Sequence, residues 1–206
     1  MTAALFLDRD GVLNENRDDY VKSWEEFRWL PRSLDALAAL SQLDVPIFLV
    51  TNQSMIGRGR ATASTLEYIH RRMLDQIVER GGRVDAILHC PHAPDLGCEC
   101  RKPMPGMLFQ VARERSISLP RSVLIGDALT DFQLATAAEV RYIHVCSGLG
   151  QRDLRVVQSI DPGVHVAADL ADAVPLCAAI LRHETESAAR PNHIQAPTRP
   201  DSPPEP

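Results

Sequence analysis

Short apolar runs alternate along the chain with longer segments in which apolar residues recur at helical spacing. Nearly continuous apolar runs of this length are typical of strands that are buried on both faces of a parallel sheet. We predict strands at residues 4–7, 47–50, 86–89, 123–125 and 142–145.

The segments between these runs have helical periodicity. Residues 62–80 carry one apolar stripe, which consists of Leu66, Ile69, Met73 and Ile77. Two glycines follow and end that helix. Further helices are predicted at 33–43, with Ser33 as a possible N-cap, and at 106–115, 130–138 and 170–182. The alternation of strand and helix predicts a doubly wound, Rossmann-like α/β fold with a mainly parallel central sheet.

The composition changes near residue 183. Residues 184–206 are rich in proline, serine, threonine and charged residues and contain almost no large apolar side chain. Such a segment cannot bury enough surface to offset its ordering entropy. We therefore expect residues 1–183 to form one domain and residues 184–206 to be a disordered tail.

Composition and charge narrow the class of protein. The 206 residues are 45% hydrophobic and 24% charged, with a formal net charge of −5. No basic patch suggests a nucleic-acid partner, and no apolar stretch is long enough to span a membrane. The first residues lack the basic region of a signal peptide. We expect a cytoplasmic monomer that binds neither nucleic acid nor membrane.

Polar side chains follow three of the predicted strands. The sequence DRDG at 8–11 follows the first strand, TNQS at 51–54 follows the second, and GD at 126–127 ends the fourth. Ligands of open α/β sheets bind beyond the carboxyl ends of the strands. We expect these three segments to line one crevice, with the RKP sequence at 101–103 nearby.

The carboxylates of Asp8 and Asp10 suit covalent phosphoryl transfer. One can attack phosphorus, the other can protonate the leaving oxygen and later activate water, and both can help to hold Mg²⁺. Taken alone, such a segment is often a polar turn, and Thr51 or Asp127 alone is often a helix cap. A calcium loop fits poorly, because its glycine belongs at the sixth position rather than the fourth.

Three of the five cysteines are clustered. With one histidine they form a Cys-x-His and a Cys-x-Cys pair, which offers a complete tetrahedral set for structural Zn²⁺: Cys90, His92, Cys98 and Cys100. Free or redox-active thiols are the alternative. Cys146 and Cys177 stand alone and are expected to be small buried apolar residues.

In this order, DRDG, TNQS, RKP and IGD (125–127), followed by Asp131, resemble the motifs of the haloacid dehalogenase (HAD) superfamily of phosphatases. The Cys-x-His and Cys-x-Cys pairs before RKP resemble the zinc-loop branch that contains the D-glycero-D-manno-heptose 1,7-bisphosphate phosphatases and the histidinol-phosphate phosphatases. The resemblance covers roughly residues 4–150. It implies an HAD fold, and the spacing of the motifs leaves no room for a separate cap domain. The site would be covered by loops 13–29 and 90–100.

The resemblance also implies a role for each matching residue. Asp8 would be the nucleophile, Asp10 the general acid and base, Thr51 a donor to the phosphoryl group, and Lys102 its counter-charge. Mg²⁺ would be held by Asp8, Asp127 and the backbone carbonyl of Asp10. The substrate would contact Arg9, Tyr20, Asn52, Gln53, Ser54 and Arg101. Asp131 is expected to be an acid of the first helical turn or an outer contact.

The implied activity is Mg²⁺-dependent hydrolysis of a small phosphorylated metabolite through an aspartyl-phosphate. The first choice of substrate is the 7-phosphate of D-glycero-D-manno-heptose 1,7-bisphosphate. Histidinol phosphate is an alternative, because its cationic groups would suit Glu15, Asp18 and Asp19, and a non-catalytic binding module is another. The acidic net charge disfavours a DNA 3′-end phosphatase, whose domain is similar.

The chain departs from the branch in two places. Residues 16–20 differ in composition and add Arg17, which could meet a second phosphate. Ala128 stands where the branch commonly has a basic residue.

Overall fold

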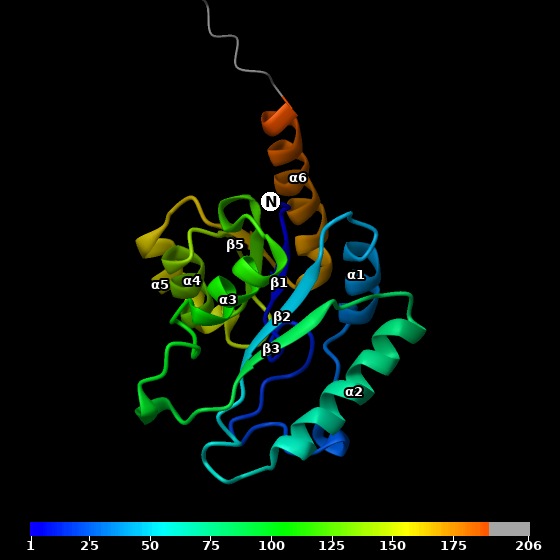
Figure 1. Ribbon diagram of the computed structural model, residues 1–206, viewed down its shortest axis with the longest axis vertical. Helices are drawn as coiled ribbons and strands as arrows, with labels where there is room; N and C mark the ends of the chain where they lie inside the picture. Colours follow the sequence, from blue (N-terminus) through cyan, green and yellow to red (C-terminus); the bar gives the residue numbers. More distant parts are fainter. Residues whose placement is uncertain (190–206) are drawn as a thin grey trace, which may run out of the picture.

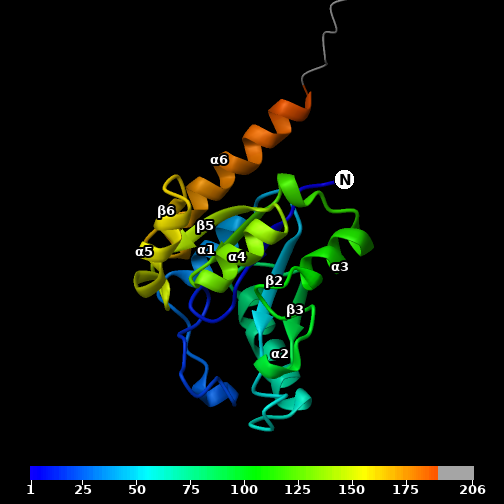
Figure 2. The same ribbon diagram turned by 90° about the vertical axis from the view of Figure 1, so that its left-hand side faces the viewer.

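The computed structural model describes residues 1–189, and their side chains through Arg182. At its centre lies one parallel sheet with the strand order β3-β2-β1-β4-β5-β6 (Figures 1 and 2). The order runs outward in both directions from the adjacent strands β1 and β4. A crevice opens at such a switch point, beyond the carboxyl ends of these two strands. The strands are β1 (Leu5–Leu7), β2 (Ile47–Asn52), β3 (Ala86–Cys90), β4 (Val123–Gly126), β5 (Arg141–Val145) and β6 (His165–Ala167).

Helices cover both faces of the sheet. One apolar cluster contains residues of α1 (Ser33–Leu40), α2 (Ala63–Glu79) and α6 (Leu170–Ala189). The opposite cluster contains residues of α3 (Gly106–Arg115), α4 (Leu129–Ala137) and α5 (Gly150–Ile160). Short 3-10 helices are η1 (Trp24–Glu26), η2 (Pro94–Leu96) and η3 (Leu119–Arg121). The predicted doubly wound α/β fold with a parallel sheet is therefore confirmed.

The strands are apolar throughout because both of their faces are buried. Leu5 and Leu7 belong to the cluster with α1, α2 and α6, whereas Phe6 points to the other face. There Phe6 stacks on Phe48 of β2, with ring centroids 5.6 Å apart. A run without alternation is what this double burial requires.

Some boundaries and elements differ from the predictions. β2 continues through Thr51 and Asn52, and β3 continues to Cys90. The helix α5 and the strand β6 were not predicted from the pattern. In α5 only Gly150 and Val157 are buried, and β6 has three residues, so each element contributes few buried residues.

Ser33 is not the N-cap of its helix. The cap is Arg32, in the left-handed region at φ 63°. The Ser33 hydroxyl instead donates to the carbonyl oxygens of Leu13 and Leu30, at 2.9 and 2.8 Å. This serine therefore fastens the loop after β1 to the start of α1.

The last helix extends beyond its predicted end at residue 182. α6 continues to Ala189, so the first six residues of the segment predicted to be disordered are helical (184–189). They contain Glu and Ala, which favour helix, and no proline occurs until Pro191. The rest of the predicted tail, 190–206, lies outside the described residues. Among the helices that are described, none is long and apolar enough to cross a membrane.

Leu49→Ala should lower the free energy of unfolding by about 2–5 kcal/mol, because it removes a fully buried side chain at the centre of the sheet. Val78→Ala, at a side chain that is 67% exposed, is the matched control and should change it by less than about 0.5 kcal/mol. Urea denaturation followed by circular dichroism measures both. Equal losses in the two variants would contradict the placement of the core.

Candidate active site

The polar residues at the carboxyl ends of β1, β2 and β4 meet in one hollow of about 150 Å³. The hollow lies at the switch point, where the amide of Asp8 continues the β1–β4 pairing by donating to the Ile125 carbonyl at 3.0 Å. Its lining includes every residue predicted to be catalytic, together with others that the motifs did not indicate: Asp8, Asp10, Asn16, Thr51, Asn52, Lys102, Asp127, Ala128, Thr130 and Leu149.

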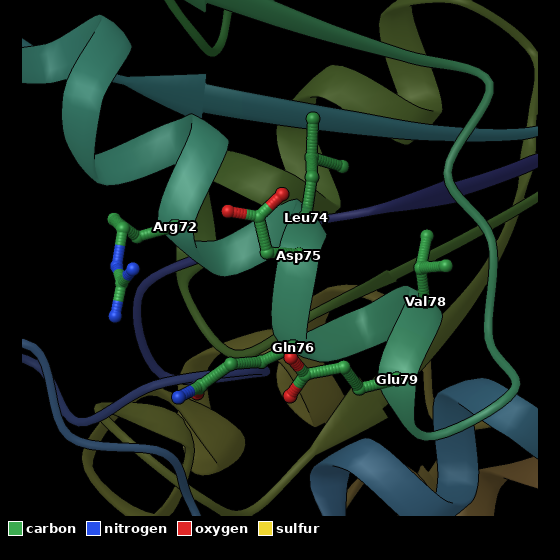
Figure 3. Close-up of a pocket in the computed structure, with 6 residues that line it drawn as sticks. All are labelled: Arg72, Leu74, Asp75, Gln76, Val78 and Glu79. Atoms are coloured by element: carbon green, nitrogen blue, oxygen red, sulfur yellow. The ribbon is translucent and has the colours of Figure 1, made fainter.

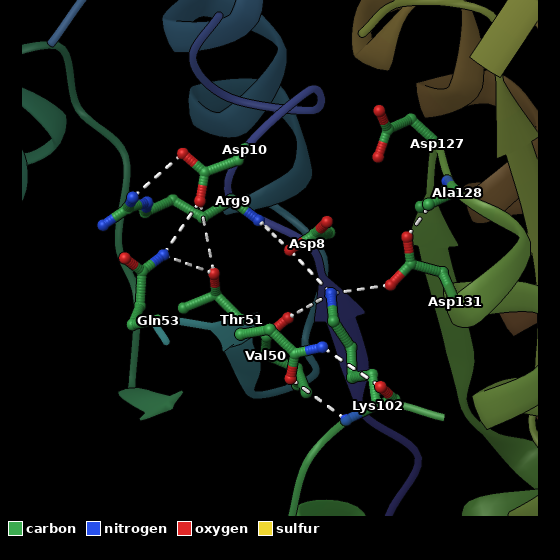
Figure 4. A network of polar contacts seen from close by, with 12 residues as sticks. Asp8, Arg9, Asp10, Val50, Thr51, Gln53, Lys102, Asp127, Ala128 and Asp131 are labelled. Carbon is green, nitrogen blue, oxygen red and sulfur yellow. Dashed lines mark hydrogen bonds and ion pairs between the residues drawn. The ribbon is translucent and has the colours of Figure 1, made fainter. Parts of the chain in front are cut away.

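Lys102 is the buried cation of this hollow. Its ammonium donates to Asp8 Oδ1 at 2.8 Å, to Asp131 Oδ1 at 2.7 Å and to the Val50 carbonyl at 3.0 Å (Figure 4). Burial alone would lower the pKa of Lys102, but the carboxylates of Asp131 and Asp8 raise it above its ordinary value. The lysine is therefore charged at neutral pH and fixes the orientation of the Asp8 carboxylate.

Asn52 positions Lys102 through the backbone. Its side-chain amide donates to the Lys102 carbonyl at 3.1 Å, and its Oδ1 accepts from the Lys102 amide at 3.0 Å. Two opposed bonds of this kind fix a loop residue against the end of β2. The structure thus assigns Asn52 a contact with Lys102 as well as a place in the lining of the hollow.

Asp131 has two partners. Its Oδ1 pairs with Lys102, and its Oδ2 accepts from the Ala128 amide at 3.1 Å in the first turn of α4. The predicted first-turn acid is thus where the sequence pattern places it. The ion pair with Lys102 was missed, because the two residues lie on different elements and share no motif spacing.

Asp127 adds a further buried carboxylate. Carboxylate oxygens of Asp8, Asp127 and Asp131 lie within 4.8 Å of one another. Asp127 Oδ2 accepts from the Leu149 amide at 2.6 Å and from Asn16 Nδ2 at 3.0 Å. The N-cap of α4 is Ala128 and Thr51 lies within β2, so neither Asp127 nor Thr51 caps a helix.

The pKa values of Asp127 and Asp8 are both raised in this buried cluster of carboxylates. Burial and the charge of Asp131 raise the pKa of Asp127 to about 7. Burial also raises the pKa of Asp8 well above its ordinary range, against the opposing charge of Lys102. One ammonium faces three acids, so the site carries excess negative charge. An oxygen-only donor set with this excess fits Mg²⁺, which Asp8 and Asp127 would hold.

Asp10 lies beside this group in a different environment. Arg9 Nη2 and Asn14 Nδ2 each donate to its Oδ1 at 2.9 Å. Gln53 Nε2 donates to its Oδ2 at 2.8 Å, and the Thr51 hydroxyl lies 3.4 Å from the same oxygen. Burial would raise the pKa of Asp10, but the charge of Arg9 and these hydrogen bonds lower it below its ordinary value. Two neighbouring acids thus have oppositely shifted pKa values.

A second hollow of about 280 Å³ adjoins the first and shares Asp10, Asn16, Asn52 and Leu149 with it. It contains the predicted substrate contacts Arg9, Tyr20, Gln53 and Arg101, and it adds Arg17 and Val21. Ser54 lines neither hollow, and its hydroxyl lies 3.3 Å from the Tyr20 hydroxyl. Every residue predicted to be catalytic, to bind substrate or to hold Mg²⁺ is therefore at or beside this crevice.

A further hollow of about 430 Å³ lies on α2 and has no such chemistry (Figure 3). Most of its lining side chains are exposed, including Arg72, Asp75 and Glu79. It contains none of the predicted site residues, so we interpret it as a solvated helix surface.

The loop after β5 closes the crevice from one side and was not anticipated. A Cβ atom at Gly148 would lie 2.2 Å from Asp127 Oδ2, and one at Gly11 would lie 2.0 Å from the same atom. The Ser147 hydroxyl donates to the Gly11 carbonyl at 2.7 Å. Small residues on both loops thus allow the backbones to approach this carboxylate. The only signal in the sequence is the repeated glycine at 148 and 150.

The predicted zinc ligands come together between β3 and α3. The Sγ atom of Cys90 lies 3.5 Å from that of Cys98 and 3.3 Å from that of Cys100. His92 Nδ1 lies 3.2 Å from Cys100 Sγ. Tetrahedral Zn²⁺ with Zn–S bonds of about 2.3 Å separates two sulfurs by about 3.8 Å, so the cluster fits this ion. His89 is outside it and packs edge-on against His70.

The isolated cysteines differ from each other. Cys177 is fully buried in the cluster with α6, as predicted, and burial raises the pKa of its thiol to about 12. Cys146 is only partly buried.

An Asp-x-Asp pair, a buried lysine and a buried carboxylate cluster at this switch point define a phosphatase site of the HAD type. The chain belongs to the HAD-like hydrolase family. The HAD-hydrolase-like family model matches residues 99–173, and relatives that are more than 40% identical cover 73% and 81% of the chain.

Individual relatives point to one activity within this family. The D-glycero-beta-D-manno-heptose-1,7-bisphosphate 7-phosphatase of Bordetella bronchiseptica is 43% identical over 81% of this chain and 93% of its own. That of Pseudomonas aeruginosa is 42% identical over 73% of this chain and 84% of its own. The structure of D,D-heptose 1,7-bisphosphate phosphatase from B. bronchiseptica, complexed with magnesium and phosphate, superposes with a TM-score of 0.81. It is 41% identical, and the match covers 85% of this chain and 97% of that one.

Gly11→Ala should lower the affinity for Mg²⁺ by about tenfold, because the added Cβ atom would collide with the Asp127 carboxylate. The backbone φ of +90° at this position also disfavours a side chain. Isothermal titration of the protein with MgCl₂ measures the affinity. Gly59→Ala is the matched control: its φ is +66°, but nothing lies within 4 Å of the added atom. It should share the backbone strain and keep the affinity. Equal affinities in the two variants would contradict Asp127 as a ligand.

Proposed function

We propose that the chain hydrolyses the 7-phosphate of D-glycero-D-manno-heptose 1,7-bisphosphate in a Mg²⁺-dependent reaction. The observation that carries this proposal is the second hollow, where Arg101 and Arg17, the latter in an exposed pair with Asp19, lie beside the phosphoryl site. Arg101 Nη1 is buried without a partner among the described residues. A guanidinium with an unused donor can bind a phosphate oxygen. A substrate with two phosphates would therefore place one phosphate in each hollow.

The first chemical step uses Asp8 and Asp10. An Asp8 oxygen forms a bond to phosphorus while the bond from phosphorus to the sugar oxygen breaks. That oxygen takes a proton from Asp10 and leaves as an alcohol. The pKa of Asp10 is low in the free site, and an incoming phosphate dianion raises it, because its charge opposes that of Arg9.

The second step reverses the role of Asp10. Its carboxylate takes a proton from water, the water oxygen bonds to phosphorus, and the bond to Asp8 breaks to release phosphate. Lys102 orients Asp8 and offsets its charge throughout, and Thr51 donates to a phosphoryl oxygen. Mg²⁺, when bound, neutralises charge on the phosphate and on the carboxylates.

Histidinol phosphate is less well supported. Its cationic groups would need free acids in the loop after β1. Asp19 instead pairs with Arg17 at 3.1 Å and with Lys22. Glu15, Asp18 and Asp19 are not among the residues that line either hollow.

We also propose that residues 1–183 form the catalytic domain of a cytoplasmic monomer. The chain has a net charge of −5, which disfavours nucleic-acid partners. Its cysteines are unpaired in the described part of the chain, as a reducing compartment would keep them.

With Mg²⁺ present, phosphate release should be at least tenfold more efficient from heptose 1,7-bisphosphate than from heptose 7-phosphate or histidinol phosphate, because only the bisphosphate engages Arg17 and Arg101. Both anomers of the bisphosphate should be assayed. Asp8→Asn should abolish release and leave the circular dichroism spectrum and the zinc content unchanged.

Arg17→Ala tests whether the second phosphate binds at Arg17. It should raise KM for the bisphosphate by about tenfold and leave the monophosphate unaffected. Weak and equal turnover of all substrates would overturn the assignment of substrate. Activity in Asp8→Asn would remove Asp8 as the nucleophile.

Cys100→Ser should lose zinc and lower kcat by about tenfold or more, because Cys100 precedes the Arg101-Lys102 pair and its loop would no longer hold Lys102 in place. Metal analysis of the purified protein and a phosphate-release assay measure the two effects. Cys146→Ser, outside the cluster, should retain both zinc and activity. Full activity in a zinc-free Cys100→Ser protein would contradict a structural role for the ion.

A further inference from the structure

Arg9 is a buried cation held between two groups from different elements. Its side chain is 1% exposed, directly after β1. Nη2 donates to Asp10 Oδ1 at 2.9 Å, and Nη1 lies 3.2 Å from Nε2 of His70 on α2 (Figure 4 shows the side of the contact with Asp10). The helix α2 therefore reaches the active site through this arginine.

The chemistry of the contact fixes the state of His70. A guanidinium can only donate hydrogen bonds, so Nε2 must accept and the imidazole must carry its proton on Nδ1. Burial and the charge of Arg9 lower the pKa of His70 to about 3. His89, whose ring centroid lies 5.8 Å away, also has a lowered pKa, through burial and the same arginine. His70 is thus a neutral acceptor.

A neutral acceptor suits this position better than the alternatives. Within the described part of the chain, Asp10 is the only acid in an ion pair with Arg9. A carboxylate at position 70 would divide the charge of Arg9 between two acids. An apolar side chain would leave Nη1 without a partner, next to Arg9 Nε, which already lacks one.

His70 also interrupts a pattern. The other buried residues of α2 are Leu66, Ile69, Met73 and Ile77, and all of them are apolar. A further apolar residue would satisfy packing there. The imidazole is explained by its contact with Arg9.

We propose that His70 is a positioning residue for phosphoryl transfer: it accepts from Arg9 and thereby holds the guanidinium, and with it the Asp10 carboxylate, in the orientation that delivers a proton to the leaving oxygen. The proposal rests on the role of Asp10 in the proposed function. It predicts an effect that depends on how much the leaving group needs a proton.

The test compares kcat/KM for two substrates in the Mg²⁺-loaded enzyme. When the 7-phosphate of heptose 1,7-bisphosphate is attacked, the sugar oxygen leaves as an alkoxide unless it is protonated. The p-nitrophenolate that leaves p-nitrophenyl phosphate needs no proton. His70→Leu and His70→Phe should lower kcat/KM for the sugar phosphate by about tenfold, mainly through kcat, and change it by less than about threefold for the aryl phosphate. His70→Gln keeps a neutral acceptor and should stay within about threefold of the parent protein for both.

A double-mutant cycle separates this role from packing. If His70 acts through Arg9, His70→Leu should cause no further loss in an Arg9→Met background. Equal losses for both substrates, additive losses in the cycle, or no rescue by His70→Gln would overturn the proposal. Thermal melts establish that each variant is folded. If His70→Leu does not fold, His70→Phe is compared with His70→Gln instead.

The proposed function can fail separately. Asp10→Asn with undiminished activity on the sugar phosphate would refute the role of Asp10 whatever the His70 variants do. Loss of activity in Asp10→Asn, with no leaving-group dependence in the apolar His70 variants, would refute only the role of His70.

Discussion

The buried ammonium of Lys102 is the interaction on which the site depends. It neutralises part of the charge of Asp8 and Asp131, which could not otherwise be brought so close inside the protein. One cation does not balance the cluster, and burial together with the charge of Asp131 raises the pKa values of Asp8 and Asp127. The same imbalance makes the site receptive to Mg²⁺. Burying this negative charge costs free energy in the free protein, and the cation that binds there offsets it.

The position of Lys102 is determined by structure on several sides of the crevice. Asn52 holds its backbone from the end of β2, and the Cys/His cluster shapes the loop that precedes it. Asp131 meets it from the first turn of α4. Rigid elements therefore supply the reacting groups, and a loop whose Cys/His cluster fits Zn²⁺ completes them. This arrangement resembles the use of preorganised electrostatics in other phosphoryl-transfer sites.

In the proposed function, the choice of substrate depends on a loop rather than on the sheet. The second hollow is lined in part by the loop between β1 and α1, where Arg17 and Tyr20 lie. Loops tolerate changes in sequence better than the sheet does. The chemistry at Asp8 and Asp10 can therefore stay the same while this loop changes what is bound. Ala128, in the position where the branch commonly has a basic residue, is compatible with a cation supplied instead by Arg17.

The sequence by itself determined the class of fold and the location of the site. Apolar runs reveal strands because burial on both faces requires them, and motifs at three strand ends converge because parallel strands end at one edge. It did not reveal α5, in which only Gly150 and Val157 are buried, or β6, which has only three residues. Nor did it reveal the pairing of Asp131 with Lys102, the approach of Gly148 to Asp127, or the contact of His70 with Arg9. Those depend on distances between residues far apart in the chain, and only the packing of helices and loops on the sheet decides them.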